Sequence, residues 1–420
     1  MEETIVANED HLGRTELYRI AFAIPDFRSD KGGAERYLVS LCHYLARQGW
    51  AVHVYAEAWA QDESGIHFHR IESFPFPKSL RLLTFATRAT RQARRGGFNV
   101  TFGVGNTLEA DVLQPHGGVH WAWFWRSLEA YDSPLVRTAK FLGRVFSLKQ
   151  WISGWIEDAS YRRGGPLKII AISEMVKQDM IRWYKIPAER VTVVYNGVDT
   201  DRFHPGTDRS REDIRRRHGI GGEFLILFVS NNFRMKGLAY LIRALALLKS
   251  MDQAPFRLLV LGRDHPGSYA RLAQRMGVSE AVIFGGSTTE PEKYYGAADL
   301  LVHPTFYDAC SLTVLEALAS GLPVVTTASN GACGLLTSNE GGRVVENARD
   351  VRALAEAIQY FFDKQRREDA SRMARRKAEA HSEKSNFDQI VGILQEAAAM
   401  KGVLSGGVKG RSGDGGNALG

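Results

Sequence analysis

Two acidic side chains, Asp308 and Glu316, lie eight positions apart in the segment HPTFYDACSLTVLEALASGLPVVTT, residues 303–327. The apolar pattern predicts a strand, then a loop, then a helix that begins near Ser311 and stops at Gly321. Asp308 falls in the loop, and Glu316 falls about one and a half turns inside the helix. A helix start offers unpaired backbone N–H groups and the positive end of the helix dipole. The two carboxylates can therefore flank a ligand bound there, although a helix cap and a solvated helix residue fit the same two acids.

The segments that must position these acids alternate between strand and helix. In the second half of the chain, apolar runs that predict strands lie at residues 224–230, 256–262, 282–284, 300–303, 323–327 and 343–345. Amphipathic stretches between them, such as 238–248, predict helices. In the first half, strands are predicted at 18–25 and 51–56 around a helix at 34–45. This alternation predicts doubly wound α/β sheets, whose ligands bind beyond the carboxyl ends of the strands.

The length and the charge of the chain limit its organisation and its partners. At 420 residues the chain exceeds one ordinary core, so we predict two domains with a boundary near 190–220, around the turn Asn196–Gly197. The predicted parts are a flexible tail at 1–17, a first domain at 18–190, a second domain at 191–385, a C-terminal helix at 386–400 and a disordered tail at 401–420. The net charge of +7 suits anionic partners, which include nucleotide diphosphates, nucleic acid and an anionic membrane surface.

The sequence also indicates a compartment. Three widely spaced cysteines match neither a metal-binding spacing nor a disulfide framework, which favours a reducing environment. Residues 1–17 are polar and acidic and lack the apolar core of a signal peptide. No stretch reaches the roughly 18–20 apolar residues that span a bilayer. We therefore expect a cytoplasmic protein, peripheral on the inner face of the cytoplasmic membrane and not crossing it.

The segment at 303–327 resembles glycosyltransferase family 4, whose mark is an acid, seven residues and a second acid that run into EA-x-A-x-G-x-PV. The matching residues are Asp308, Glu316, Ala317, Ala319, Gly321, Pro323 and Val324. Features that agree in order and spacing are Asn196–Gly197–Val198–Asp199 with Phe203 and Pro205, Lys236–Gly237, and Gly32–Gly33. The resemblance spans about residues 18–365. It implies a GT-B fold, in which two Rossmann-like, doubly wound α/β domains face each other across a cleft.

The chain departs from the family at its first acid, which is usually Glu. Asp308 stands here in the form YDACS, and its side chain is about one carbon shorter. An Asp followed by x-Cys-Ser is similar to a subgroup of lipopolysaccharide-core enzymes. The resemblance is therefore closest to that subgroup, and Asp308 keeps the role of the acid that contacts the sugar.

The resemblance implies a retaining transfer from a UDP-, GDP- or ADP-linked sugar, without a metal, another cofactor or a protein nucleophile. Glu316 would bind the ribose hydroxyls of the nucleotide. Lys236, with Arg234 as its partner, would neutralise the diphosphate and stabilise the charge that develops on the leaving group. The transferred sugar would be held by Asp308 and by the backbone N–H groups of Ala309, Cys310, Ser311 and Leu312.

Further positions complete the predicted site. Gly32 and Gly33 follow the first strand, and glycine lets a backbone approach a phosphate or a sugar closely. His116 lies in VLQPHGGVH, where family members often carry a histidine near the reacting carbon; His120 competes for this role, and a purely structural histidine also fits the loop. The nucleotide base is expected near Phe284.

Residues 119–165 interrupt the α/β rhythm. Their large aromatic residues are Trp121, Trp123, Phe124, Trp125, Trp151 and Trp155, and their basic residues are Arg126, Arg137, Lys140, Arg144, Lys149, Arg162 and Arg163. This combination fits a membrane–water interface, and aromatic faces also stack on sugars. A helical insertion that packs its aromatic residues into the first domain fits as well. Basic and aromatic surfaces also bind nucleic acid, but no nucleic-acid motif occurs, so we predict no such partner.

Together these features predict an enzyme that moves a hexose or heptose from a nucleotide sugar to a glycolipid, with lipopolysaccharide core as the acceptor. One alternative is a family 4 enzyme that acts on a soluble glycan or a small metabolite. The other alternative is a GT-B scaffold without catalytic activity. The intact set of Asp308, Glu316 and Lys236 argues against the scaffold.

Overall fold

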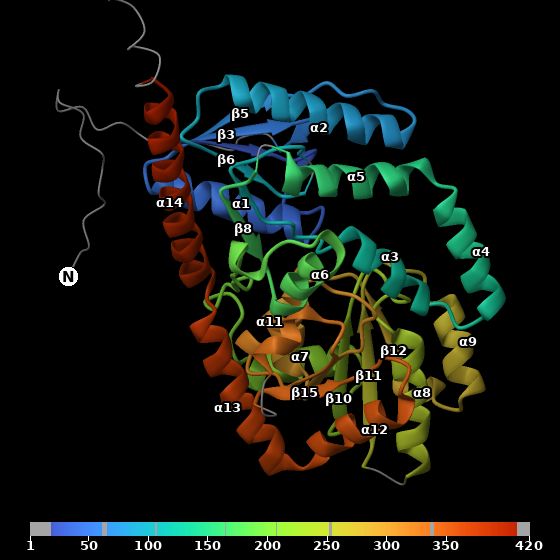
Figure 1. Ribbon diagram of the computed structural model, residues 1–420. Helices are drawn as coiled ribbons and strands as arrows, with labels where there is room; N and C mark the ends of the chain where they lie inside the picture. The colour runs from blue at the N-terminus through green and yellow to red at the C-terminus, as the bar shows by residue number, and fades with distance from the viewer. Residues whose placement is uncertain are drawn as a thin grey trace, which may run out of the picture.

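The chain folds into two α/β units. The computed structural model describes residues 18–60, 65–105, 107–163, 165–206, 208–251, 254–336 and 340–409. The predicted tail at 1–17 lies outside these residues, as does 410–420. Figure 1 shows one unit above the other, with α13 (Lys364–Ala380) beside the lower unit and α14 (Glu383–Lys409) beside the upper one.

The first domain is built on a seven-stranded parallel sheet in the order β5-β3-β1-β6-β7-β8-β9. Its strands are β1 (Arg19–Ala23), β3 (Ala51–Ala56), β5 (Ile66–Arg70), β6 (Val100–Gly103), β7 (Val112–Leu113), β8 (Lys168–Ala171) and β9 (Val191–Val193). Its helices are α1 (Gly33–Arg47), α2 (Lys78–Arg95), α3 (His120–Glu129), α4 (Pro134–Val145), α5 (Leu148–Arg162) and α6 (Glu174–Tyr184). The short strands β2 (Asp26–Phe27) and β4 (Ala58–Trp59) pair separately. The strand order reverses between β1 and β6, which marks a ligand crevice at their carboxyl ends.

The second domain repeats this plan with a six-stranded parallel sheet in the order β12-β11-β10-β13-β14-β15. Its strands are β10 (Phe224–Val229), β11 (Phe256–Leu261), β12 (Val282–Gly286), β13 (Leu300–His303), β14 (Val324–Thr327) and β15 (Gly342–Val345). Its helices, besides α13, are α7 (Asp208–Arg217), α8 (Leu238–Ser250), α9 (Gly267–Arg275), α10 (Pro291–Ala297), α11 (Leu312–Ala319) and α12 (Val351–Gln359). The order reverses between β10 and β13, so the second crevice lies beside the predicted chemical segment.

Local sequence explains the helix that carries Glu316. Ser311 stands in an extended conformation immediately before α11, and Gly321 follows the helix with a φ of 65°, a left-handed conformation that favours glycine. Six of the eight residues of α11 are buried, because apolar residues occupy most faces of the helix. Glu316 is therefore a carboxylate held by a rigid, buried helix and not by a mobile loop.

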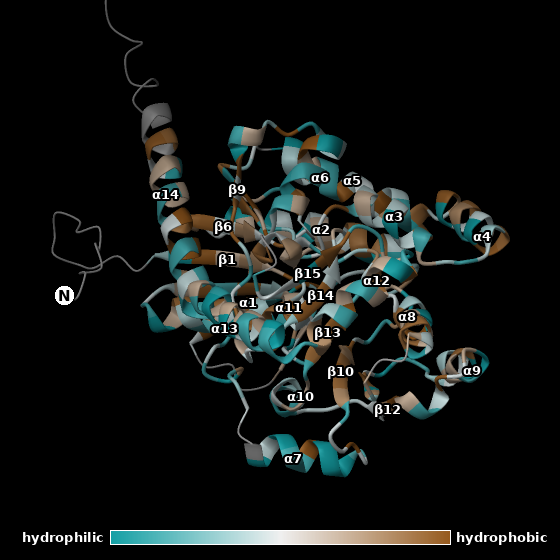
Figure 2. Ribbon diagram, turned by 90° about the horizontal axis from the view of Figure 1, so that it is seen from below, coloured by the Kyte–Doolittle hydropathy of each residue, from teal (hydrophilic) through white to brown (hydrophobic). Residues whose placement is uncertain are grey.

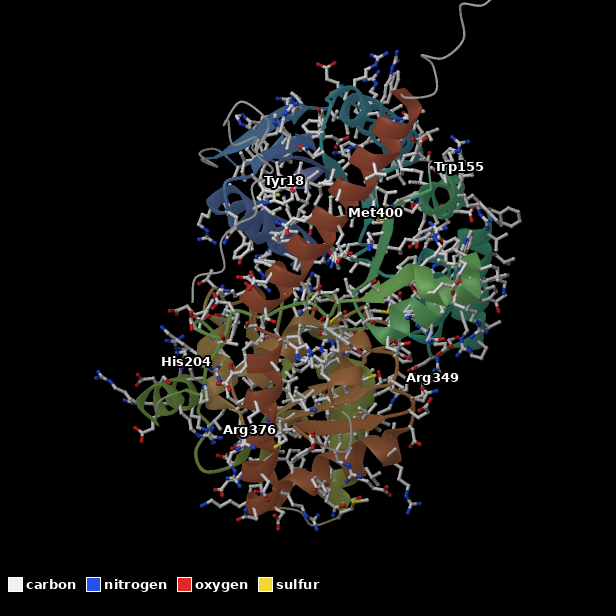
Figure 3. All side chains as sticks on the ribbon, turned by 60° about the vertical axis from the view of Figure 1, so that its left-hand side comes forward. Tyr18, Trp155, His204, Arg349, Arg376 and Met400 are labelled. Atoms are coloured by element: carbon white, nitrogen blue, oxygen red, sulfur yellow. The ribbon has the colours of Figure 1, made fainter. Side chains whose placement is uncertain are left out.

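The two domains are joined by polar contacts and by a shared apolar cluster. The Tyr307 hydroxyl accepts a hydrogen bond of 2.9 Å from the backbone N–H of Val119, and the Ser173 hydroxyl donates one of 2.7 Å to the Ala309 carbonyl. Figure 3 shows Arg349 where the second domain meets α3, and its guanidinium donates to the carbonyl of Tyr131 at 2.7 Å. Figure 2 shows the apolar strands inside and the polar helices α7 and α13 outside. The loops at the carboxyl ends of both sheets are thus held against each other.

Two elements that follow residue 190 in the sequence pack with the first domain. The strand β9 begins at Val191, the first residue of the predicted second domain, but pairs within the first sheet. The helix α14 returns to the first domain and buries Phe387, Ile390 and Leu394 in its core. The core of the first domain therefore contains residues from α14 as well as residues from the first half of the chain.

The C-terminal helix extends beyond its predicted range of 386–400. Residues 401–409, which we expected in the disordered tail, continue α14. The reason is visible at Lys401, whose ammonium binds the carboxylate of Asp111 at 2.8 Å and so ties this turn to the first domain. Among the residues described, no helix is both long and apolar enough to cross a membrane.

Candidate active site

Two neighbouring hollows lie between the domains. The larger, of about 430 Å³, is lined by the starts of α1 and α11 and by the loop after β10. The smaller, of about 130 Å³, contains Glu316 and shares Arg36 and Leu312 with the larger one. Both lie beyond the carboxyl ends of parallel strands, where open α/β sheets bind their ligands.

Asp308 and Lys236 meet in the larger hollow. The Lys236 ammonium lies 2.5 Å from Oδ2 of Asp308, and Nε2 of His303 lies 3.5 Å from the same oxygen. Burial raises the pKa of Asp308, but the Lys236 charge and the hydrogen bond from His303 oppose it and hold this pKa well below its usual range. Asp308 is therefore a carboxylate at every physiological pH, and Lys236 is its counter-ion beside open space.

The position of Lys236 depends on the glycine that follows it. Gly237 has a φ of 76° and immediately precedes α8. A Cβ at this position would lie 2.1 Å from the carbonyl oxygen of Pro304, so no other residue fits without moving the backbone. The close approach brings the loop after β10 against the loop after β13, and it explains why Lys236 reaches Asp308.

Glu316 is 7% exposed and has two partners. Its Oε2 accepts a hydrogen bond of 2.8 Å from the Tyr295 hydroxyl, and its Oε1 forms a 2.6 Å ion pair with Arg36 of the first domain. Gly197 and Val198 of the predicted Asn-Gly-Val-Asp motif line the same hollow. Sequence analysis missed Arg36 as a partner, because the two residues lie 280 positions apart.

Some backbone groups after Asp308 already form hydrogen bonds with asparagine side chains. The Ser311 N–H donates to Oδ1 of Asn330 at 3.3 Å, which makes Asn330 a supporting residue that sequence analysis did not find. The carbonyl of Cys310 accepts from the Asn196 side chain at 3.3 Å. Cys310, Ser311 and Leu312 line the larger hollow, whereas Ala309 is buried beside it. Burial raises the pKa of Cys310 to about 12, so its thiol stays neutral.

Gly32 and Gly33 line the larger hollow from the side of the first domain. A Cβ on Gly33 would lie 3.0 Å from Cδ1 of Leu312, at the start of α11. The glycine therefore allows the start of α1 to approach the start of α11 closely. Two helix N-termini, each with a positive dipole end, converge on one space.

The two candidate histidines occupy different places. His116 lines the larger hollow and its ring centroid lies 4.3 Å from that of Tyr37; both His116 and His120 line a third hollow next to it, and His120 lines only this third one. Burial lowers the pKa of His116 to about 3 and that of His120 to about 4, so both rings are neutral. In each ring Nε2 is buried without a hydrogen-bond partner. His116 is thus the histidine that lies with Asp308 and Lys236.

Two predicted residues lie elsewhere. The Arg234 guanidinium stacks 4.5 Å from the ring centroid of Tyr131 and does not line the hollow that holds Lys236. Phe284 lies on β12, at the edge of the sheet, and packs partly against the core of the second domain. Among the residues described, Lys31 and Arg36 are the cations that line the hollow together with Lys236, and Arg234 is not one of them.

The segment 119–165 forms α3, α4 and α5, and its aromatic residues divide into two groups. Trp121, Trp123 and Phe124 pack inward. The exposed large apolar side chains of the segment are Trp125, Leu135, Val136, Leu142, Phe146, Leu148, Trp151 and Trp155. No residue of α4 is buried: Phe141 packs on the ring of Trp125 and Arg144 donates to the carbonyl of Phe124 at 2.8 Å, whereas Leu135, Val136 and Leu142 of this amphipathic helix are exposed.

Comparison with known proteins gives two adjoining family matches. Residues 31–202 match the model described as Glycosyltransferase Family 4, and residues 210–380 match the model described as Glycosyl transferases group 1. The lipopolysaccharide glucosyltransferase WaaG of Escherichia coli K12 is 26% identical over 336 residues, which cover 75% of this chain and 82% of WaaG. The D-inositol 3-phosphate glycosyltransferase of Corynebacterium aurimucosum is 26% identical over 357 residues, which cover 80% of this chain and 83% of the relative.

Solved structures confirm the predicted GT-B fold. The crystal structure of WaaG superposes with a TM-score of 0.72 at 24% sequence identity and covers 89% of this chain and 99% of WaaG. Anabaena Alr3699/HepE in complex with UDP-glucose superposes with a TM-score of 0.67 at 17% identity and covers 90% of this chain and 99% of that protein. The two sheets and their facing carboxyl ends are therefore a shared architecture.

Proposed function

The chain belongs to the group 1 and family 4 glycosyltransferases, and we propose that it transfers a sugar to a glycolipid, with lipopolysaccharide core as the favoured acceptor class. It is a retaining enzyme that takes its sugar from a nucleotide-sugar donor. We assign donor binding to the second domain and acceptor binding to the first. The observation that carries the donor assignment is the pair of neighbouring hollows, one lined by Glu316 and the other by Lys236 beside Asp308.

In the proposed donor complex the ribose hydroxyls bind the carboxylate of Glu316. The diphosphate then lies in the larger hollow, where Lys236 and the helix starts stabilise the charge that develops as the glycosidic bond breaks. Arg36 pairs with Glu316 in the structure and also lines the larger hollow. When the ribose hydroxyls bind Glu316, the Arg36 guanidinium can therefore leave this carboxylate and bind a phosphate of the donor. Asp308 holds the hydroxyls of the transferred sugar.

Cations replace a metal in this proposal. Lys236 and Arg36 supply the positive charge that a divalent ion supplies at other diphosphate sites. The described residues include no group of three or more His, Cys, Asp or Glu side chains arranged to hold a metal ion. A metal-dependent turnover, lost on treatment with EDTA and restored by Mg²⁺ or Mn²⁺, would contradict this part of the proposal.

The exposed face of α4 and α5 favours a glycolipid acceptor over a soluble one. Leu135 on α4 and Phe146 immediately after it are each 84% exposed, and Lys140 of α4 lies between them in the sequence. Apolar side chains flanked by Lys and Arg bind the interface of an anionic membrane. Figure 3 shows Trp155 of α5 on the outer side of the same part of the molecule. We propose that this face holds the enzyme peripherally on the inner face of the cytoplasmic membrane.

One screen tests the donor assignment. In a thermal-shift assay with UDP-, GDP- and ADP-sugars, the donors with one of these bases should raise the Tm of the protein. The Glu316→Gln variant should lose that rise in Tm. No stabilisation by any donor would favour the scaffold without activity. Co-sedimentation with anionic vesicles tests the acceptor class: salt-sensitive binding supports a glycolipid acceptor, and the lack of salt-sensitive binding would favour a soluble glycan or a small metabolite. The inositol phosphate relative gives that second candidate its specific support.

A further inference from the structure

A third hollow, of about 540 Å³, lies wholly in the first domain. The loops after β1, β6 and β7 form its floor, and α3 and α5 cover it. Its place is the point where the strand order of the first sheet reverses, which is the expected position of a ligand. Its size falls within the range of about 300–1,000 Å³ that is usual for sites that bind small molecules.

This third hollow adjoins the proposed donor site. It shares Ala34 and His116 with the hollow that contains Lys236 and Asp308. The three hollows therefore follow one another in a row, from Glu316 through Asp308 to the covering helices. A ligand in the third hollow would lie next to the sugar that leaves the nucleotide.

Unpartnered polar atoms line the third hollow. Nε2 of His116 and Nε2 of His120 are buried and have no hydrogen-bond partner, and Oε1 of Glu157 has none apart from the neighbouring hydroxyl of Tyr184, which lies outside the lining. Glu157 is only 7% exposed. Buried polar atoms are costly unless they are hydrogen-bonded, so the two histidine nitrogens, with the Glu157 carboxyl beside them, indicate that a ligand with several hydroxyls completes them.

The charges of the lining disfavour a phosphate. Among the described lining residues, Asp26, Glu35 and Glu157 carry carboxyl groups and only Lys149 carries a fixed positive charge. The start of α3 would attract an anion, but Oε2 of Glu157 already accepts its first N–H, that of His120, at 2.8 Å. Burial raises the pKa of Glu157 to about 8, so near neutral pH this carboxyl is mostly protonated and uncharged. The lining therefore offers neutral donors and acceptors.

We propose that this hollow binds the acceptor, and that it selects an uncharged, hydroxyl-rich sugar residue and rejects a sugar or inositol phosphate. The proposal rests on the proposed function and sharpens it, since it separates the two acceptor classes of the relatives. Glu157 is the residue that sets this preference, because it donates to an acceptor hydroxyl and caps the helix start that a phosphate would otherwise occupy. Trp123 supplies an apolar wall.

The first test compares matched probes on the wild-type enzyme saturated with UDP. Saturation-transfer NMR measures the binding of methyl mannoside against mannose 6-phosphate, and of myo-inositol against D-inositol 3-phosphate. The neutral member of each pair should bind more tightly, by more than about tenfold, because a phosphate meets carboxyl groups without a cation clamp. Tighter binding of the phosphorylated members, or no binding of either neutral probe at millimolar concentration, overturns the proposal. Failure of every nucleotide to bind would instead refute the donor assignment on which it rests.

The second test uses variants of α5. Glu157→Gln keeps an acceptor for the His120 N–H and a donor into the hollow, so its Kd for the neutral probe should stay close to that of the wild type. Glu157→Leu removes both and should raise that Kd by roughly 2- to 12-fold, the range for one neutral hydrogen bond. Asp158→Asn is the matched control, since Asp158 pairs with Arg162 on the same helix and does not line the hollow. Equal Kd values for the Leu variant and the wild type would overturn the assignment of Glu157, and so would a Gln variant as weak as the Leu variant.

Discussion

Replacing Glu316 separates its role in folding from its role in donor binding. The Tyr295 hydroxyl, on a residue 1% exposed, donates to Oε2, and Glu316→Ala leaves this buried donor without a partner at a cost of roughly 1–3 kcal/mol. The Arg36 pair adds little, about 0–1 kcal/mol, because the Arg36 side chain is 39% exposed. Glu316→Gln keeps an acceptor for Tyr295, so it should lose less stability than the Ala variant.

The Gln variant then isolates the carboxylate in binding. A hydrogen bond to a charged acceptor contributes about 1 kcal/mol more than one to a neutral acceptor, so two ribose hydroxyls account for about 2 kcal/mol, or roughly 30-fold in Kd. This is an upper limit, since Arg36 must first leave the carboxylate in the wild type.

Isothermal titration with UDP and 2′-deoxy-UDP measures this effect, or the matching pair if the screen selects another base. Wild type should prefer the ribonucleotide, and Glu316→Gln should lose most of that preference. Glu383→Gln is the control, because Glu383 lines the same hollow but is assigned no ribose contact. An unchanged preference in Glu316→Gln, or a preference lost in Glu383→Gln, would refute the reasoning.

Three further predictions concern catalysis, pH and membranes. Lys236→Ala should lower kcat by about 10²–10³, the usual effect of removing one preorganised donor, and a change in KM alone would contradict this role. The pKa of Glu157 is raised from 4.5 to about 8 on folding, so the native state binds its proton more tightly and stability should fall as pH rises through this window, by at most about 1.4 kcal/mol per unit. Chemical denaturation at several pH values should show a shallower slope for Glu157→Gln, and an equal slope would refute the assignment. Leu135→Asp and Phe146→Asp should each weaken binding to anionic vesicles by about 10- to 100-fold without loss of stability, because each side chain would insert into the interface. Phe76→Asp, at a site 81% exposed in the first domain, should bind vesicles like the wild type, and equal binding by all three variants would rule out this face.

The sequence predicted what local patterns determine. The strand, loop and helix around Asp308 and Glu316 follow from apolar spacing, the glycine at 321 and the family resemblance. Lys236 was assigned from the family resemblance, by the position of the pair Lys236–Gly237 after the strand predicted at 224–230. The GT-B fold, with its two parallel sheets, was likewise predicted and is confirmed.

Contacts between distant segments could not be predicted in this way. Arg36 reaches Glu316 across the domain junction, and no local pattern links them. Arg234 is near Lys236 in sequence, yet its side chain turns to the ring of Tyr131 in the other domain. Glu157 resembled an ordinary polar residue of an amphipathic helix, and only tertiary packing buries it beneath the start of α3.

A structure of the enzyme with an intact nucleotide sugar tests the central claim most directly. The ribose hydroxyls should lie within hydrogen-bond distance of Glu316 in place of Arg36, with the diphosphate at Lys236 and the sugar at Asp308. A nucleotide bound elsewhere, or one bound here while Arg36 still pairs with Glu316, would contradict the account.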